Sequence, residues 1–181
     1  MAIAIVGLSP SESLAPWDDI EHEKWGLPWS GYWAQCDRLF EMHCLELLRR
    51  HPEVRAPDYF DKLASVWVPL YMQEAYPDFP CRVYPFEAVA ETTGAYWNSS
   101  IGYMLALAIH EGHPQIDIYG VDMKADEEYF YQRPNIEYLI GLARGKGRIV
   151  TLHESSVCRF IGSGISFGKH SVNYPERYGQ L

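Results

Sequence analysis

Several familiar sequence signals are missing from this 181-residue chain. The loop after the first apolar run offers Gly7, Ser9 and Ser11, but neither a complete Gly-x-Gly-x-x-Gly nor a Walker lysine, so no standard phosphate loop identifies a cofactor. The four cysteines form no Cys-x-x-Cys pair, and His110 and His113 have no third ligand nearby in the sequence, which disfavours a zinc site. No apolar stretch approaches the length of about 20 residues that a membrane-spanning helix needs.

Positive charge is also scarce. The chain has 15 Lys and Arg against 24 Asp and Glu, a formal net charge of −9. A surface of that sign repels polyanions, so we expect no duplex nucleic-acid surface and no binding to anionic membranes. A single nucleotide remains compatible, because a few backbone amides can hold it. The short N-terminal apolar run lacks a basic leader, and the cysteines are widely spaced; together these features predict reduced core thiols in a cytoplasmic protein.

Residues 98–123 carry the most informative pattern that is present. A helix is predicted by the apolar face Ile101, Met104, Leu105, Ala108 and Ile109. Asn98–Ser100 supplies N-cap oxygens at the helix start, Gly112 ends the helix, and 116–121 is typical of a buried strand followed by Asp122. Ligands of open α/β sheets bind at the carboxyl ends of strands and at helix N-termini, so this segment offers two contact points.

Strands and helices alternate along most of the chain. We expect strands at 2–6, 23–27, 37–43, 66–72, 116–121 and 148–152, and helices at 45–50 and 57–64, over the apolar face above, and from Pro134 to about Gly145. Pro69 makes 66–72 an edge strand or a strand end, and the Pro-containing segment 76–96 reads as an irregular connection with a turn of helix at 86–90. The predicted fold is a Rossmann-like α/β domain of three layers over residues 1–160, with a mostly parallel sheet covered by helices on both faces. Residues 161–181 are expected to form an extended tail through which a homo-oligomer could assemble.

Four polar segments follow strands in this topology and should meet at one edge of the sheet: 7–11, 41–43, Asp122 with the loop 124–133, and 153–154. His43 and His153 are candidate general bases, because imidazole titrates near neutral pH. Asp122 could orient an acceptor hydroxyl or hold Mg²⁺, and a turn or capping role is equally open. The loop 124–133 is long enough to act as a flap, with Tyr129, Tyr131, Gln132 and Arg133 as donors to a phosphate.

These residues also resemble known families. The run Asn98-Ser-Ser-Ile-Gly-Tyr-Met-Leu-Ala-Leu-Ala-Ile109, with Gly112 and 116–122, is similar to the helix–strand core of bacterial sialyltransferases that use CMP-activated sialic acid, and to MptE-like pterin diphosphokinases. That likeness covers about residues 95–125. Over about residues 2–155, including Phe40-Glu-Met-His43 and 131–144, the pattern resembles uncharacterised Rossmann-like proteins of tailed phages, which implies the cytoplasm of an infected bacterial host.

The sialyltransferase resemblance implies roles for particular positions. Its N-terminal Gly loop and Asn/Ser helix start bind the nucleotide, which implies Gly7, Ser9, Asn98, Ser99 and Ser100 here; its flap tyrosines steady the leaving phosphate, which implies Tyr129 or Tyr131. The chain departs from that pattern because its flap, 124–133, is short and lacks the family's catalytic histidine. His153 then takes that part, or the chemistry differs.

Three functions follow as expectations. The first is a protein that binds a nucleotide or nucleotide sugar and transfers a glycosyl or phosphoryl group to a small molecule or modified base. The alternative is a non-catalytic phage accessory module that binds or sequesters a nucleotide or a host factor. A structural subunit that assembles through the tail is a third.

Overall fold

The computed structural model describes residues 1–51, 56–122 and 127–153, with the side chains of 127–130 left out. Seven strands form one sheet in the order β5-β4-β3-β2-β1-β6-β7, and every neighbouring pair is parallel. The strands are β1 (Ala2–Val6), β2 (His22–Gly26), β3 (Arg38–Glu41), β4 (Leu70–Met72), β5 (Cys81–Val83), β6 (Gln115–Tyr119) and β7 (Ile149–Leu152). This is the predicted α/β, Rossmann-like architecture with a parallel sheet.

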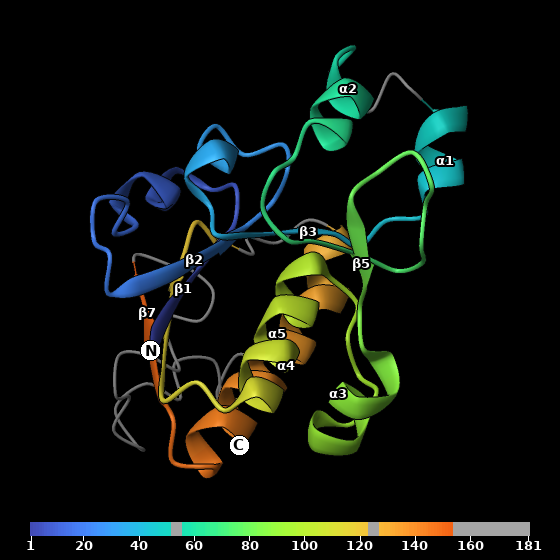
Figure 1. Ribbon diagram of the computed structural model, residues 1–181. Helices are drawn as coiled ribbons and strands as arrows, with labels where there is room; N and C mark the ends of the chain where they lie inside the picture. The colour runs from blue at the N-terminus through green and yellow to red at the C-terminus, as the bar shows by residue number, and fades with distance from the viewer. Residues whose placement is uncertain (52–55, 123–126, 154–181) are drawn as a thin grey trace, which may run out of the picture.

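Helices cover both faces of the sheet (Figure 1). On one face α4 (Ser100–Glu111) and α5 (Glu127–Gly145) lie side by side, with α3 (Phe86–Thr93) next to α4. On the other face lie α1 (Leu45–Arg50) and α2 (Tyr59–Ala64), and two short 3₁₀ helices, η1 (Pro10–Leu14) and η2 (Trp33–Gln35), sit in the connections around β2. Strands buried on both faces explain the continuous apolar runs of the sequence.

The core consists mainly of two apolar clusters separated by the sheet. The first joins Ile3 and Ile5 of β1, which pair in register with Ile116 and Ile118 of β6, to the apolar face of α4. The second packs α1 and α2 against β3 and β4, around Leu39, Leu63 and Leu70. Two separate cores fix the sheet from both sides, so the strand ends provide rigid attachment points for loops.

The chain order creates one topological switch point. From β1 the chain adds strands outward one at a time to β5, and α4 then carries it back across the sheet to β6, on the other side of β1. The connections that follow the neighbouring strands β1 and β6 therefore lead in opposite directions along the sheet, one to β2 and the other to β7. A crevice at such a point, outside the carboxyl ends of the strands, is where open α/β sheets bind ligands.

Two expectations about individual elements are wrong, and one alternative is decided. The segment 76–96 contains a short strand, β5, and a helix of two turns, α3, instead of an irregular connection with one turn. Of the two alternatives for Pro69, the strand end is correct: it lies directly before Leu70, and β4 is an interior strand because it pairs with β5. The expected flap over 124–133 and the expected helix start at Pro134 are also wrong from residue 127 onward, because α5 begins at Glu127 and Pro134 lies inside it.

Two further expectations meet the limits of the described chain. The tail 161–181 and residues 123–126 lie outside the described residues, so the oligomerisation prediction stays a prediction. Within the part of the chain that the structure covers, no helix combines the length and apolar character needed to cross a membrane.

Candidate functional site

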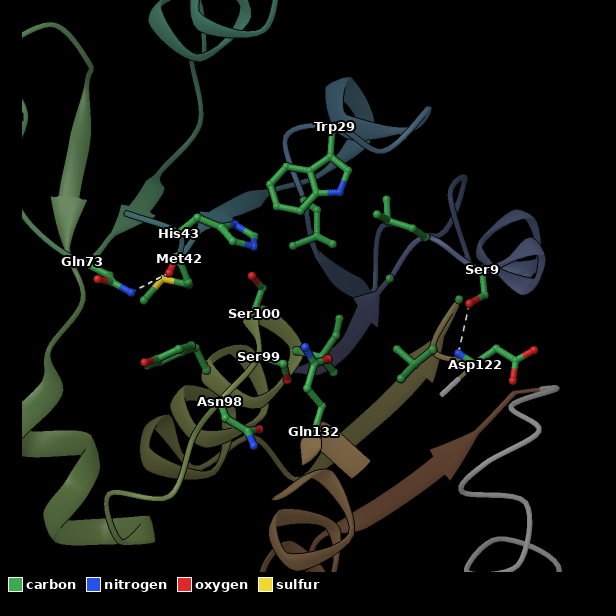
Figure 2. Close-up of a pocket in the computed structure, with 17 residues that line it drawn as sticks. Ser9, Trp29, Met42, His43, Gln73, Asn98, Ser99, Ser100, Asp122 and Gln132 are labelled. Atoms are coloured by element: carbon green, nitrogen blue, oxygen red, sulfur yellow. Dashed lines mark hydrogen bonds between the residues drawn. The ribbon is translucent and has the colours of Figure 1, made fainter. Parts of the chain in front are cut away.

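A cavity of about 390 Å³ opens at the switch point (Figure 2). This volume is in the range typical of small-molecule sites. Its walls come from the loops after β1, β2, β3, β4 and β6, from the start of α4 and from α5, and three of the four segments expected to converge, at 7–11, 41–43 and Asp122, contribute to it. The lining residues are Gly7, Leu8, Ser9, Leu27, Trp29, Met42, His43, Gln73, Asn98, Ser99, Ser100, Ile101, Tyr103, Gly120, Val121, Asp122 and Gln132.

The loops after β1 and β6 touch each other at the floor of the cavity. Gly7 donates its N–H to the Tyr119 carbonyl (2.9 Å), and Ser9 donates to the Gly120 carbonyl (2.8 Å). A Cβ on Gly7 would lie 2.3 Å from the Gly120 carbonyl oxygen, and Gly120 itself has a φ of +63°. Ser9 Oγ also accepts the Asp122 N–H (3.1 Å). Gly7 is thus needed for the approach of two loops, and Ser9 fixes their positions.

The start of α4 is directed at this floor. Ser99 is the N-cap: its backbone is extended and its Oγ accepts the Gly102 N–H at 3.1 Å, as predicted. The amides of Ser100 and Ile101 belong to the first helical turn, where N–H groups have no intrahelical acceptor. Asn98 lines the cavity and donates its Nδ2 to the Tyr131 carbonyl (2.6 Å), which ties this edge of the site to α5. The helix therefore presents a partial positive charge and unpaired donors to a ligand.

His43 forms the opposite wall, beyond the end of β3. Its Nδ1 lies 2.6 Å from Glu41 Oε1, which also accepts the His43 backbone N–H at 2.9 Å. The Glu41 side chain is fully buried, whereas that of His43 is 46% exposed. The His43 ring packs at 5.4 Å from Trp29, which lies above it in Figure 2. A histidine held by a buried carboxylate and facing a cavity can accept a proton on its other nitrogen.

Asp122 lies at the far end of the cavity from His43. Figure 2 shows it beside Ser9, with its carboxylate directed away from His43. No group of three His, Cys, Asp or Glu side chains among the described residues could hold a metal ion. A Mg²⁺ ion held by the single carboxylate of Asp122 is a different arrangement and stays a prediction.

The expectation that His153 shares this cavity is not met. His153 follows β7, stacks on Tyr119 (4.1 Å, 9° between planes), and places Nε2 3.7 Å from Asp117 Oδ1. Asp117 is buried and also accepts hydrogen bonds from Gln115 (2.7 Å) and contacts His22 Nε2 (3.2 Å). These side chains form a polar cluster on the sheet face opposite α4. His153 therefore packs on Tyr119 and lies near Asp117 instead of lining the cavity.

The four proposed phosphate donors of the flap do not share one position. Gln132 lines the cavity, whereas Tyr131 is 70% exposed and does not line it, and Arg133 pairs with Glu137 one helical turn away (2.6 Å). Tyr129 falls in the first turn of α5, where only the backbone is described, so its role stays a prediction. The side chains of 131, 132 and 133 project in different directions around the helix axis, whereas a loop could have gathered them.

Three polar or aromatic lining side chains were not among the candidates from the sequence: Trp29, Gln73 and Tyr103. Gln73 directly follows β4 and Trp29 lies in the loop after β2, so the strand-end rule could have found both once those strands were placed. Tyr103 lies one turn into α4, and burial raises its pKa, which keeps the hydroxyl protonated at neutral pH. It belongs to an aromatic cluster with Tyr84, whose hydroxyl donates to the Tyr103 carbonyl (2.9 Å).

No protein-family model matches the chain, and no curated protein matches it significantly. Solved structures with a similar fold do exist. The alpha-2,3-sialyltransferase from Campylobacter jejuni in its apo form superposes with a TM-score of 0.56 at 16% identity, covering 88% of this chain and 78% of that one.

Two further sialyltransferase structures show the same likeness. CST-II in complex with a trisaccharide acceptor and CMP has a TM-score of 0.54 at 15% identity, over 90% of this chain and 85% of that one. CstII from Campylobacter jejuni with the substrate analogue CMP-3FNeuAc has a TM-score of 0.50 at 14% identity, over 87% and 80%. At this identity the comparisons establish a shared fold: the chain has the Rossmann-like α/β fold of these sialyltransferases.

Proposed function

We propose that this protein binds a nucleotide or a nucleotide-activated sugar in the switch-point cavity and transfers the activated group. The observation that carries the proposal is the placement of the α4 N-terminus, capped by Ser99, at the floor of a cavity of ligand size. Backbone amides at a helix start bind phosphate without needing side-chain cations. Structures of the same fold were solved with CMP and with a CMP-sugar analogue, which supports a nucleotide as the ligand.

The charge of the lining favours a phosphate that carries one negative charge. Among the described residues, no Lys or Arg lines the cavity, and Asp122 adds a carboxylate. Di- and triphosphates concentrate two or more negative charges, which proteins usually balance with Lys, Arg or Mg²⁺. A phosphodiester between a nucleoside and a sugar needs only the helix amides and hydroxyls such as Ser100. CMP-sugars have this linkage.

His43 is the general base of the proposed transfer. With Nδ1 donating to Glu41, its Nε2 has a lone pair available for an acceptor hydroxyl. The acceptor oxygen bonds to the anomeric carbon as its proton moves to Nε2, and the bond from that carbon to the phosphate oxygen breaks. The electron pair leaves on the phosphate, whose added charge the α4 amides stabilise. The acceptor would occupy the part of the cavity next to His43, and the phosphate the part next to the start of α4.

One substitution isolates the amide contribution. Ser100→Pro removes a single N–H at the first helical position, where proline is well tolerated, and Ser99 already has the extended backbone (φ −151°, ψ 155°) that a following proline requires. The matched control Ser100→Ala keeps the N–H and removes only the hydroxyl. Because a hydrogen bond to a charged group contributes about 1.5–3 kcal/mol, we expect Ser100→Pro to weaken CMP binding by roughly 10- to 150-fold beyond Ser100→Ala. Equal affinities of the two variants in calorimetry would contradict a phosphate at this helix start.

A second pair of variants tests the chemistry. CMP release from a CMP-linked sialic acid is followed with and without a sugar acceptor. His43→Gln should retain CMP affinity but lower turnover by about 10²–10⁴-fold, the usual contribution of a general base. His110→Gln is the control, because His110 is exposed on α4 and contacts Thr92 outside the cavity. Equal turnover of the two variants would remove His43 from the reaction.

Binding without turnover is the second candidate function. It is favoured by the start of α5 at Glu127, which leaves only four residues, 123–126, between Asp122 and that helix. A lid that excludes water usually needs a longer segment. If CMP stabilises the protein against heating while no nucleotide sugar on a broad panel is consumed, this function replaces the transferase.

A further inference from the structure

Glu41 is an unusual residue for a parallel strand. It is the last residue of β3, its side chain has no exposed surface, and it pairs in register with Met72 of β4. Among the described residues, two hydrogen bonds reach its carboxylate, both from His43 to Oε1: one from the backbone N–H (2.9 Å) and one from Nδ1 (2.6 Å). Within the described part of the chain, Oε2 is buried and has no hydrogen-bond partner.

Fold stability alone gives no reason for a charge at this position. Burying a carboxylate with one unsatisfied oxygen is costly, and a neutral glutamine could accept the same two hydrogen bonds with a smaller desolvation penalty. The negative charge adds one thing that an amide lacks: it stabilises an imidazolium on His43. That contribution matters only when His43 takes up a proton.

We propose that Glu41 is a positioning residue for His43. By accepting a hydrogen bond from Nδ1, it fixes the neutral ring as the Nδ1–H tautomer and leaves the Nε2 lone pair for the cavity, which His43 lines. When Nε2 accepts a proton from an acceptor hydroxyl, the carboxylate stabilises the resulting imidazolium and stays ionised itself. This is how a buried carboxylate assists a catalytic histidine in general. The catalytic consequence rests on the proposed function; the tautomer does not.

The tautomer can be measured in the unliganded protein. Long-range ¹H–¹⁵N correlation spectra of the full chain, with ¹⁵N-labelled histidine and His43 assigned through His43→Gln, distinguish a protonated Nδ1 from a protonated Nε2. At a pH where the ring is neutral, we expect Nδ1–H in the wild type and in Glu41→Gln, whose amide oxygen still accepts. Glu41→Met should shift the ring toward Nε2–H. An Nε2–H wild type, or a tautomer unchanged in Glu41→Met, would overturn the proposal.

Turnover of a CMP-sugar supplies the second measurement. Glu41→Gln keeps the tautomer and loses the charge, so we expect kcat to fall by about tenfold or more, within the 10²–10⁴-fold attributed to His43, while KM stays unchanged. The matched control is Glu111→Gln, which removes the carboxylate of another Glu–His pair, with His113 (3.1 Å), at the amino end of the sheet. It should leave kcat and the His43 tautomer unchanged.

The two proposals fail in distinguishable ways. If no CMP-sugar is bound or consumed while His43 shows the Nδ1–H tautomer that depends on Glu41, the proposed function is wrong and the positioning of His43 stands. If CMP-sugar turnover depends on His43 and is equal in wild type and Glu41→Gln, the transferase stands and Glu41 has no positioning role. The wild-type spectrum decides the tautomer even if Glu41→Met does not fold.

Discussion

Gly7→Ala should both destabilise the protein and distort its cavity. The added Cβ would lie 2.3 Å from the Gly120 carbonyl oxygen, where real Cβ contacts begin at about 3.0 Å, so the loops must separate by at least about 0.7 Å. Adding that displacement to the 2.8 Å bond from Ser9 N–H to the Gly120 carbonyl gives about 3.5 Å, the limit of a hydrogen bond. Gly7 has no positive φ, so lack of space is the only obstacle.

The expected cost follows from two terms. Overpacking against a backbone atom costs about 1–3 kcal/mol, and a weakened hydrogen bond loses about 1 kcal/mol more. We therefore expect Gly7→Ala to lower the free energy of unfolding by about 2–4 kcal/mol, measured by urea denaturation. CMP binding should weaken as well, because both displaced loops line the cavity.

Gly31→Ala provides the matched control. No atom lies within 4 Å of a Cβ at that position, and its φ is not in the left-handed region. Alanine there should be neutral or stabilise by up to about 1 kcal/mol through the unfolded state. If Gly7→Ala and Gly31→Ala unfold at the same urea concentration, the contact between the two loops has no energetic importance, and the account of the cavity floor is wrong.

Three other perturbations test separate parts of the structure. Ser99→Ala removes the α4 cap and should cost about 1 kcal/mol in urea denaturation, whereas Ser99→Asp should retain it; equal losses would exclude capping. Burial raises the pKa of Glu111, but hydrogen bonds from His113 and Arg38 and the charge of Arg38 outweigh it, so its pKa is lowered in the folded protein. Its stabilisation is therefore present above the ordinary carboxyl pKa of 4.5 and is lost as pH falls through the lower folded-state pKa. Glu111→Gln should accordingly reduce the difference in unfolding free energy between pH 7 and pH 3. Burial, with the charge of Asp37 adding to it, raises the pKa of Cys36 to about 12, so iodoacetamide at pH 8 should modify Cys36 only in the unfolded protein, and rapid native labelling would contradict its burial.

The segment around α4 was predictable because its signals are local. The cap at Ser99, the helix, its end at Gly112 (φ +81°) and the following strand each depend on residues a few positions apart. N-cap oxygens, helical periodicity and left-handed glycines act within one turn of chain. The position of this segment at the edge of a ligand-sized cavity followed from the strand-end rule.

Contacts between distant segments were not predictable in the same way. Gly7 reads as a phosphate-loop glycine, and its approach to Gly120 depends on which strand lies next to β1. Pro134 carries the sequence signal of a helix start, yet α5 extends past it to Glu127 and gives up one backbone hydrogen bond at the proline. That extension placed Tyr131 and Arg133 on a helix instead of a loop, so the expected phosphate donors were separated.

The two candidate bases show what decides whether a histidine after a strand can reach a ligand. In β7, Val150 is buried among the residues under α4 and α5 and Leu152 packs against them, so strand alternation sends His153 to the opposite face. The hydrogen-bond pattern of the sheet continues through His153, because the His153 N–H donates to the Ile118 carbonyl at 2.9 Å. The His153 ring is therefore held on that face, where it stacks on Tyr119. His43 lies two residues beyond the end of β3, where strand alternation no longer fixes the direction of the side chain. The hydrogen bond with Glu41 orients its ring instead. His153, one residue after its strand, keeps the side-chain direction that the strand imposes. His43, two residues after its strand, is oriented by its hydrogen bond with Glu41, and this difference makes His43 the stronger candidate for the general base.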